Sequence, residues 1–116
     1  MSTLVLYHNP RCSKSRAALA LLEARGVEHQ VIRYLEQPLT RPELESLARQ
    51  IGVAPRAMMR TKESVYGELG LASAGDEALF DSIAAHPKLL ERPILSDGER
   101  AVIGRPPEQI LTLLDH

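Results

Sequence analysis

The residues whose types suggest chemistry lie in one short stretch near the N-terminus, residues 8–16. It contains Cys12, the one cysteine among 116 residues. An apolar run at 4–7 precedes this stretch, and an apolar pattern at helical spacing begins near Ala17, so we expect a strand, a loop and a helix in that order. Cys12 would then lie at the first turn of the helix, where free backbone N–H groups and the helix dipole favour a thiolate.

Basic side chains crowd the same stretch. They are His8, Arg11, Lys14 and Arg16. Cationic neighbours at a helix N-terminus lower a cysteine pKa from about 8.5 toward neutrality, and the same surroundings would hold an oxyanion. The alternative is that Cys12 is a small buried hydrophobe, the usual role of a free cysteine. Its charged and hydroxylic neighbours argue against that role, because a packed core is apolar.

The spacing around Cys12 excludes three better-known loops. No glycine lies between Leu4 and Arg25, which excludes a glycine-rich phosphate loop. Ala18 stands where the Cys-x5-Arg loop of protein phosphatases has its arginine. Ser15 stands where a Cys-x-x-Cys motif has its second cysteine, so no internal disulfide can form. We therefore expect any redox turnover to depend on an external thiol.

Two neighbours of Cys12 are further candidate catalytic residues. His8 either stabilises the thiolate, as an imidazolium or through hydrogen bonds of its loop, or is a structural loop histidine. Ser15 either caps the first helix or donates to the thiolate, and the two roles are compatible.

Composition limits the partners of the chain. The formal charge of −1 gives no general attraction to nucleic acid or to an anionic membrane. The sequence has no signal-peptide pattern and no apolar run of about 18 residues, and a lone cysteine suits a reducing compartment. Cys and His do not cluster at ligand spacing. We expect a cytoplasmic monomer with no metal, no bound cofactor and no nucleic-acid or membrane partner.

The first half of the chain predicts a parallel βαβ unit. The first helix is expected to end at Gly26, and a second strand to run over 27–35. A right-handed crossover makes the two strands parallel. Cys12 would therefore lie at the carboxyl end of the first strand, where such sheets bind ligands.

Helices are expected in the middle of the chain. Thr40 begins a capping box followed by apolar residues at helical spacing. Further helices are predicted at 55–60 and 75–86, with a loop punctuated by glycines between them. This block, about 38–88, would be a helical insertion in a single domain of residues 1–116.

Strand signals return near the C-terminus. Apolar runs at 93–96 and 99–103 flank Asp97-Gly98, the strongest short hairpin signal. A last helix is expected at 107–114. The order β-α-β, helices, β-β-α predicts an α/β protein with the mixed sheet of a thioredoxin-like fold.

Three arginines stand at predicted element boundaries. Arg60 ends a short helix, Arg92 precedes a strand-opening proline, and Arg105 follows the last strand. Arginine has a planar, permanently charged donor fork that suits a tetrahedral oxyanion. Spacing alone leaves two alternatives, an anion site or ordinary surface arginines.

A set of short motifs covers essentially the whole chain. They are Tyr7-His8-Asn9-Pro10-x-Cys12-x-x-Ser15-Arg16, Tyr34-Leu35-Glu36, Arg56-Ala57-Met58-Met59-Arg60, Leu69-Gly70-Leu71-Ala72, His86-Pro87 and Arg92-Pro93-Ile94. Each motif is weak by itself, but their order and spacing are specific. Together they resemble the glutaredoxin-coupled arsenate reductase family.

This resemblance implies roles for the candidate residues. The cysteine matching Cys12 attacks arsenate or a similar tetrahedral oxyanion, and the arginines matching Arg60, Arg92 and Arg105 hold the oxyanion. Glutathione then reacts with the adduct as a co-substrate, and glutaredoxin reduces the resulting mixed disulfide. Pro93 resembles the cis-proline that faces the active cysteine in thioredoxin-like folds.

Similar folds suggest one alternative function. Some of them are redox-responsive regulators that bind RNA polymerase or another protein rather than a small molecule. Those regulators usually carry Cys-x-x-Cys, so Ser15 argues against this alternative.

Overall fold

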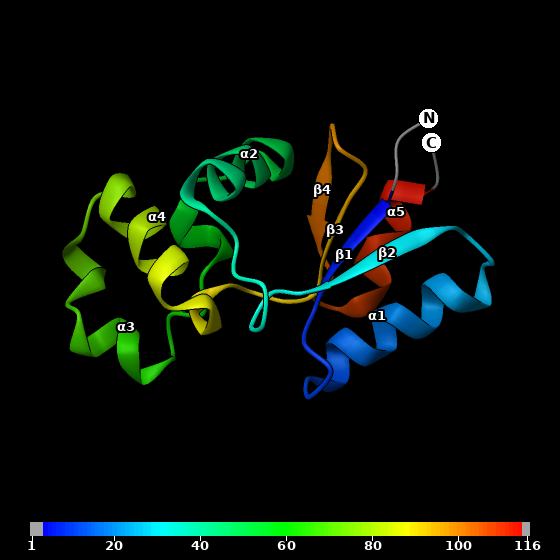
Figure 1. Cartoon of the computed structure of the whole chain (residues 1–116), viewed down its shortest axis with the longest axis horizontal. Helices are drawn as coiled ribbons and strands as arrows, with labels where there is room; N and C mark the ends of the chain where they lie inside the picture. The colour runs from blue at the N-terminus through cyan, green and yellow to red at the C-terminus, as the bar shows by residue number, and fades with distance from the viewer. Residues whose placement is uncertain (1–3, 115–116) are drawn as a thin grey trace.

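A mixed four-stranded sheet forms the centre of the computed structural model, which describes residues 4–114 (Figure 1). β1 (Leu4–His8) pairs in parallel with β2 (His29–Arg33) and antiparallel with β3 (Ile94–Ser96). β3 also pairs antiparallel with β4 (Ala101–Ile103), which gives the strand order β2-β1-β3-β4. This is the predicted thioredoxin-like arrangement.

α1 (Ser13–Ala24) connects the two parallel strands and begins directly after Cys12, as predicted. Gly26 follows its end with a φ of +64°, a left-handed conformation that glycine adopts without strain. β2 is shorter than the predicted strand. The chain turns after Arg33 because the N–H groups of Glu36 and Gln37 both donate to the Arg33 carbonyl at 2.9 Å.

α2 (Arg41–Ile51) begins with the predicted capping box. The Thr40 hydroxyl accepts from the Glu43 N–H at 3.3 Å, and the Glu43 carboxylate accepts from the Thr40 N–H at 2.9 Å. α4 (Asp76–Ala85) confirms the second of the longer predicted helices in this block.

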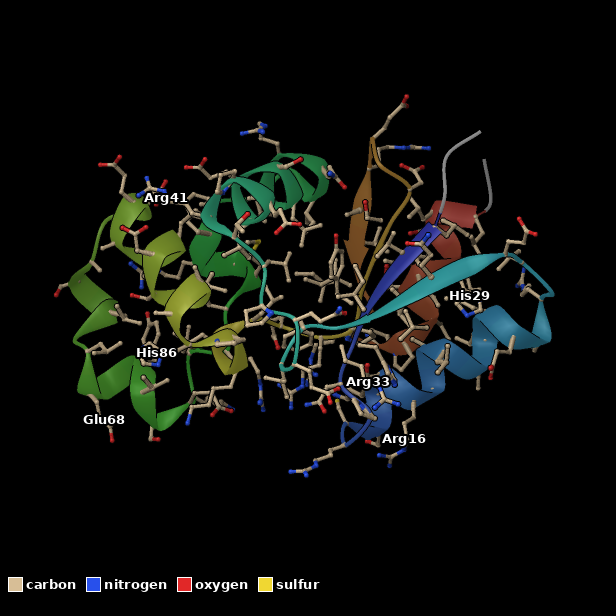
Figure 2. All side chains as sticks on the ribbon, viewed as in Figure 1. Arg16, His29, Arg33, Arg41, Glu68 and His86 are labelled. Atoms are coloured by element: carbon tan, nitrogen blue, oxygen red, sulfur yellow. The ribbon has the colours of Figure 1, made fainter. Side chains whose placement is uncertain are left out.

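Arg41 joins α2 to α4 on the outer surface of this block (Figure 2). Its guanidinium pairs with Glu45 in α2 at 3.2 Å and with Glu77 and Asp81 in α4 at 3.2 and 3.0 Å. Each exposed ion pair contributes little by itself. Three partners on two helices nevertheless hold the helices in one relative position.

The segment predicted to be a loop contains α3 (Ser64–Glu68) and the 3-10 turn η2 (Leu71–Ser73). That part of the prediction is wrong, because contacts distant in sequence stabilise these turns. The Arg56 guanidinium donates to the Tyr66 hydroxyl in α3 and to the Leu71 carbonyl in η2, the latter at 2.9 Å.

η1 (Pro55–Met58) is a single 3-10 turn that ends before the predicted helix end. The chain is extended from Met59, which forms an isolated antiparallel bridge with Leu90. The Arg60 N–H then donates to the carbonyl of Leu89 at 2.7 Å. This pairing brings Arg60 close to the chain that leads into β3.

The sheet separates two apolar cores, because successive side chains of a strand point to opposite faces. One face packs against α1, the 3-10 turn η4 (Pro107–Ile110) and α5 (Leu111–Leu114). Its buried residues are Leu6, Ala18, Leu22, Leu95, Ile110 and Leu113. The other face packs against the helices between β2 and β3, and includes Tyr34 and Ile94. None of the helices within residues 4–114 is long and apolar enough to cross a membrane.

Candidate active site

The carboxyl end of β1 brings together segments that are far apart in the sequence. His8 pairs with Arg33, so the next residues, Asn9 and Tyr34, lie side by side. Tyr7 pairs with Ile94, so the chain just before β3 also passes this end of β1. The predicted site residues therefore gather at one end of the sheet.

Cys12 is the N-cap residue of α1. Its backbone N–H donates to the Asn9 carbonyl at 3.0 Å, and its carbonyl accepts the first helical bond, from the Arg16 N–H, at 3.0 Å. Its side chain makes no capping hydrogen bond with a described residue and is half-buried. The thiol thus lies at the positive end of the helix dipole and remains accessible, unlike a core cysteine.

His8 and Ser15 are hydrogen-bonded to each other beneath the Cys12 loop. His8 Nδ1 lies 2.7 Å from Ser15 Oγ, which also accepts from the Asn9 N–H at 3.0 Å. The prediction that Ser15 caps the helix is wrong, because Cys12 occupies the N-cap and Ser15 is the third helical residue. The Ser15 hydroxyl instead fixes the loop that carries Cys12.

The surroundings of the His8 ring favour its neutral form. Burial is the main cause that lowers the pKa of His8, and the positive charges of Arg33 and Arg16 lower it further. A neutral ring supports the hydrogen-bonding role of His8 over the imidazolium role.

Arg60 and Arg105 line one cavity of about 240 Å³, on the side of the helical block. Each carries an acidic partner: Arg60 Nη1 lies 2.6 Å from the Glu63 carboxylate, and Arg105 Nε lies 3.9 Å from that of Glu91. Cys12 is not part of the lining of this cavity. The structure therefore brings two of the three predicted arginines together in one recess, which we call the arginine recess.

Arg92 has the unusual environment among the three arginines. Its Nε and Nη1 atoms are buried and have no hydrogen-bond partner among the described residues. Its carbonyl accepts from Arg105 Nη1 at 3.2 Å, so the two arginines are adjacent. Buried donors are nearly always satisfied in native proteins, so these two nitrogens of Arg92 retain unused donor capacity at this end of the sheet.

Pro93 is preceded by a cis peptide bond, as predicted. The Pro93 carbonyl accepts from the Gly104 N–H at 2.8 Å, which continues the β3–β4 ladder by one pair. A side chain at Gly104 would not fit, because its Cβ would lie 2.8 Å from Pro93 Cγ. This tight packing fixes the backbone between Arg92 and Arg105.

Tyr34 also lies close to the site, although no sequence pattern predicted a role for it. It is 1% exposed, and burial strongly raises the pKa of its hydroxyl. Arg60 lowers this pKa and Cys12 raises it, so both lie within electrostatic range of the hydroxyl. Tyr34 thus contributes a neutral phenol near both Cys12 and Arg60. The sequence feature that could have indicated Tyr34 is its position, since it is a bulky aromatic residue just beyond a strand on the ligand side of the sheet.

Comparison with known proteins gives a consistent assignment. The model of the ArsC family matches residues 7–113. An arsenate reductase of Neisseria meningitidis serogroup A is 47% identical, over 98% of this chain and all of its own length. An arsenate reductase of Escherichia coli K12 is 40% identical, over 98% of this chain and 82% of its own.

A solved structure supports the same assignment. The arsenate reductase from Vibrio cholerae superposes with a TM-score of 0.92 at 52% identity, covering 96% of this chain and 97% of its own. Both the sequence and the thioredoxin-like fold are thus shared along nearly the full length. The chain belongs to the ArsC family.

Proposed function

We propose that this protein is a thiol-dependent arsenate reductase in which the Cys12 thiolate attacks the oxyanion. The observation that carries the proposal is the pair of buried nitrogens of Arg92, Nε and Nη1, which lack a hydrogen-bond partner among the described residues at the end of the sheet where Cys12 precedes α1. A tetrahedral oxyanion supplies the acceptors that this guanidinium lacks. Arsenate is the substrate named for the relatives of 40–47% identity.

The other two arginines would complete the oxyanion site. Arg60 and Arg105 share a recess, and their carboxylate partners, Glu63 and Glu91, orient the guanidinium forks in the absence of substrate. Arg105 is also fixed by its bond to the Arg92 carbonyl. Cations that are positioned in advance stabilise developing negative charge without reorganising during the reaction.

Ser15 and His8 would support the Cys12 sulfur. A hydroxyl has one donor and two acceptor positions. When His8 Nδ1 carries the proton, Ser15 Oγ accepts from that N–H and from the Asn9 N–H. Its own proton is then free to donate to the Cys12 thiolate three residues earlier, which would stabilise the nucleophile.

The reaction would proceed in three steps. The Cys12 thiolate bonds to arsenic, and one arsenate hydroxyl takes a proton from solvent and leaves as water. A glutathione thiolate then attacks the Cys12 sulfur: the S–S bond forms, the S–As bond breaks, and its electron pair reduces arsenic(V) to arsenic(III), which leaves as arsenite. A second thiol, supplied through glutaredoxin, reduces the mixed disulfide and restores Cys12. A reducing cytoplasm would supply these thiols, and a monomer would suffice for this chemistry.

The experiment that tests this function is arsenite formation from arsenate, with glutathione and glutaredoxin each omitted in turn. We expect arsenite only when a thiol is supplied, and none from Cys12→Ser. Sustained turnover without any added thiol would contradict the proposed electron source. Absence of arsenite together with tight binding to RNA polymerase would instead support the regulator alternative.

A further inference from the structure

Two adjoining cavities lie on the α1 side of the sheet, away from the arginine recess. One has a volume of about 410 Å³ and is lined by residues 8–11, directly before Cys12, and by Arg33 and Glu36. The other has about 510 Å³, shares Arg33 and Glu36, and extends to Leu19 of α1. Both volumes lie in the range of small-molecule sites. Figure 2 shows Arg33 beside the N-terminal end of α1.

The cations of the smaller cavity are available to a ligand. Arg11 is exposed and its guanidinium pairs with no acidic side chain among residues 4–114. The Arg33 side chain is 58% exposed, and its contact with Glu36 at 3.6 Å is long and open to water, so it holds Arg33 weakly. Leu35, which is 42% exposed, adds apolar surface to the same cavity.

The position of these cavities relative to Cys12 follows from the strand register. Arg33 pairs with His8, and paired side chains of parallel strands point to the same face. His8 reaches Ser15 of α1, so Arg33 lies on the α1 side, whereas the next residue, Tyr34, enters the opposite core. The smaller cavity therefore reaches residues 8–11 of the Cys12 loop on the α1 face, whereas the arginine recess lies on the side of the helical block.

This geometry matters for the second chemical step. A thiolate that attacks a sulfur must approach in line with the bond that breaks, so it arrives opposite the arsenic. With the oxyanion held on the arginine side, the thiol must arrive from the other side, where the two cavities are open to solvent.

We propose that these cavities bind the thiol donor, as a peptide thiol with two carboxylates, the chemical class of glutathione. Arg11 and Arg33 would bind the carboxylates, and Leu35 would contact the peptide body. The catalytic use of this thiol site rests on the proposed function, but binding of the peptide thiol requires no arsenate.

The test compares two disulfides as reactants for Cys12. Glutathione disulfide and the uncharged bis(2-hydroxyethyl) disulfide both react by thiolate attack, which forms a mixed disulfide on Cys12 and releases one thiolate. The ratio of their second-order rate constants cancels any change in the thiolate fraction of Cys12. Mass spectrometry follows the single cysteine without ambiguity.

We expect Arg33→Gln and Arg11→Gln each to lower this ratio roughly five- to tenfold, with Arg33→Lys intermediate, because a charge-assisted bond to an exposed arginine is lost. Arg100→Gln is the control. Arg100 is an exposed cation on the β3–β4 turn that lines neither cavity, so the ratio should stay within twofold.

Two results would overturn this inference: an unchanged ratio in both Arg33→Gln and Arg11→Gln, or an equal fall in Arg100→Gln, which would show only a general electrostatic attraction. The outcome is separable from the proposed function. If the protein forms no arsenite but the ratios fall as expected, the thiol site is supported and the reductase function is not. If the protein forms arsenite but the ratios do not change, the reductase function is supported and the thiol site is not.

Discussion

The two faces of the sheet provide different environments at the same end of β1. On the face of the helical block, Tyr34 is buried and the Arg92 guanidinium has nitrogens shielded from water. On the α1 face, a neutral His8–Ser15 pair lies beneath the loop and Arg33 remains largely in water. Arg33 is the last residue of β2 and Tyr34 follows it directly, so two consecutive residues lie on different faces of the sheet.

This difference suggests that the two faces have different roles in the reaction. Charges act more strongly where water is excluded, because the effective dielectric constant is lower. The helical-block face is therefore suited to hold an oxyanion in one geometry, and the α1 face to admit a second reactant. Substitutions on the first face should have larger effects on arsenate reduction than substitutions on the second.

The largest effect is expected for Arg92. Arg92→Lys keeps a positive charge but loses the bidentate fork, so kcat/KM for arsenate should fall roughly ten- to hundredfold, corresponding to about 1.5–3 kcal/mol. Arg100→Lys, on the exposed β3–β4 turn, is the control and should stay within twofold. Full activity of a folded Arg92→Lys protein would contradict the claim that the face of the helical block holds the oxyanion.

A smaller loss is expected for Tyr34. Tyr34→Phe removes only the hydroxyl that lies within range of Cys12 and Arg60, so kcat/KM for arsenate should fall about fivefold, the worth of one neutral hydrogen bond. Steady-state kinetics measure this loss, and thermal unfolding checks that the core is intact. Unchanged kinetics would leave Tyr34 with a packing role alone.

The neutral His8 should appear as a pH dependence of stability. Its pKa is lowered in the fold, so the unfolded chain binds its proton first as the pH falls. The free energy of unfolding should therefore be largest above about pH 6.5 and decrease below it. His8→Gln should flatten this part of the curve in urea titrations. An identical slope in His8→Gln would show that another group causes it.

The smallest effect on arsenate reduction is expected for substitution of Arg33. Arg33→Gln should change the KM for arsenate less than twofold at saturating thiol, because Arg33 lies on the face away from the arginine recess. Steady-state titration with arsenate measures it. A large rise in that KM would place the oxyanion on the α1 face and reverse the assignment of the two faces.

Local signals in the sequence were sufficient for the features that neighbours along the chain determine. The capping box at Thr40 and the position of Cys12 before α1 were predicted. The hairpin at Asp97-Gly98 was also predicted, but its turn spans residues 97–100 and β4 begins at Ala101 rather than at Glu99. The turns α3 and η2 were not, because the Arg56 guanidinium stabilises them from a separate segment.

The candidate site shows the same limit. The sequence indicated Arg60, Arg92 and Arg105 only through family resemblance, because just the register of β3 and the Met59–Leu90 bridge bring their segments together. The role of Tyr34 depends on what surrounds its hydroxyl, which no local pattern contains. The hydrogen bonds of Ser15 likewise could not be predicted from the sequence, because Cys12 and not Ser15 is the N-cap residue of α1.

A single-turnover reaction tests the central claim most directly, that the Cys12 sulfur carries arsenic and then accepts the thiol. The protein is mixed with excess arsenate and one equivalent of glutathione, and both arsenite and the protein mass are measured. We predict about one arsenite per chain and an equal amount of glutathione mixed disulfide on Cys12. Arsenite formed while Cys12 stays unmodified, or an equal yield from Cys12→Ser, would contradict it.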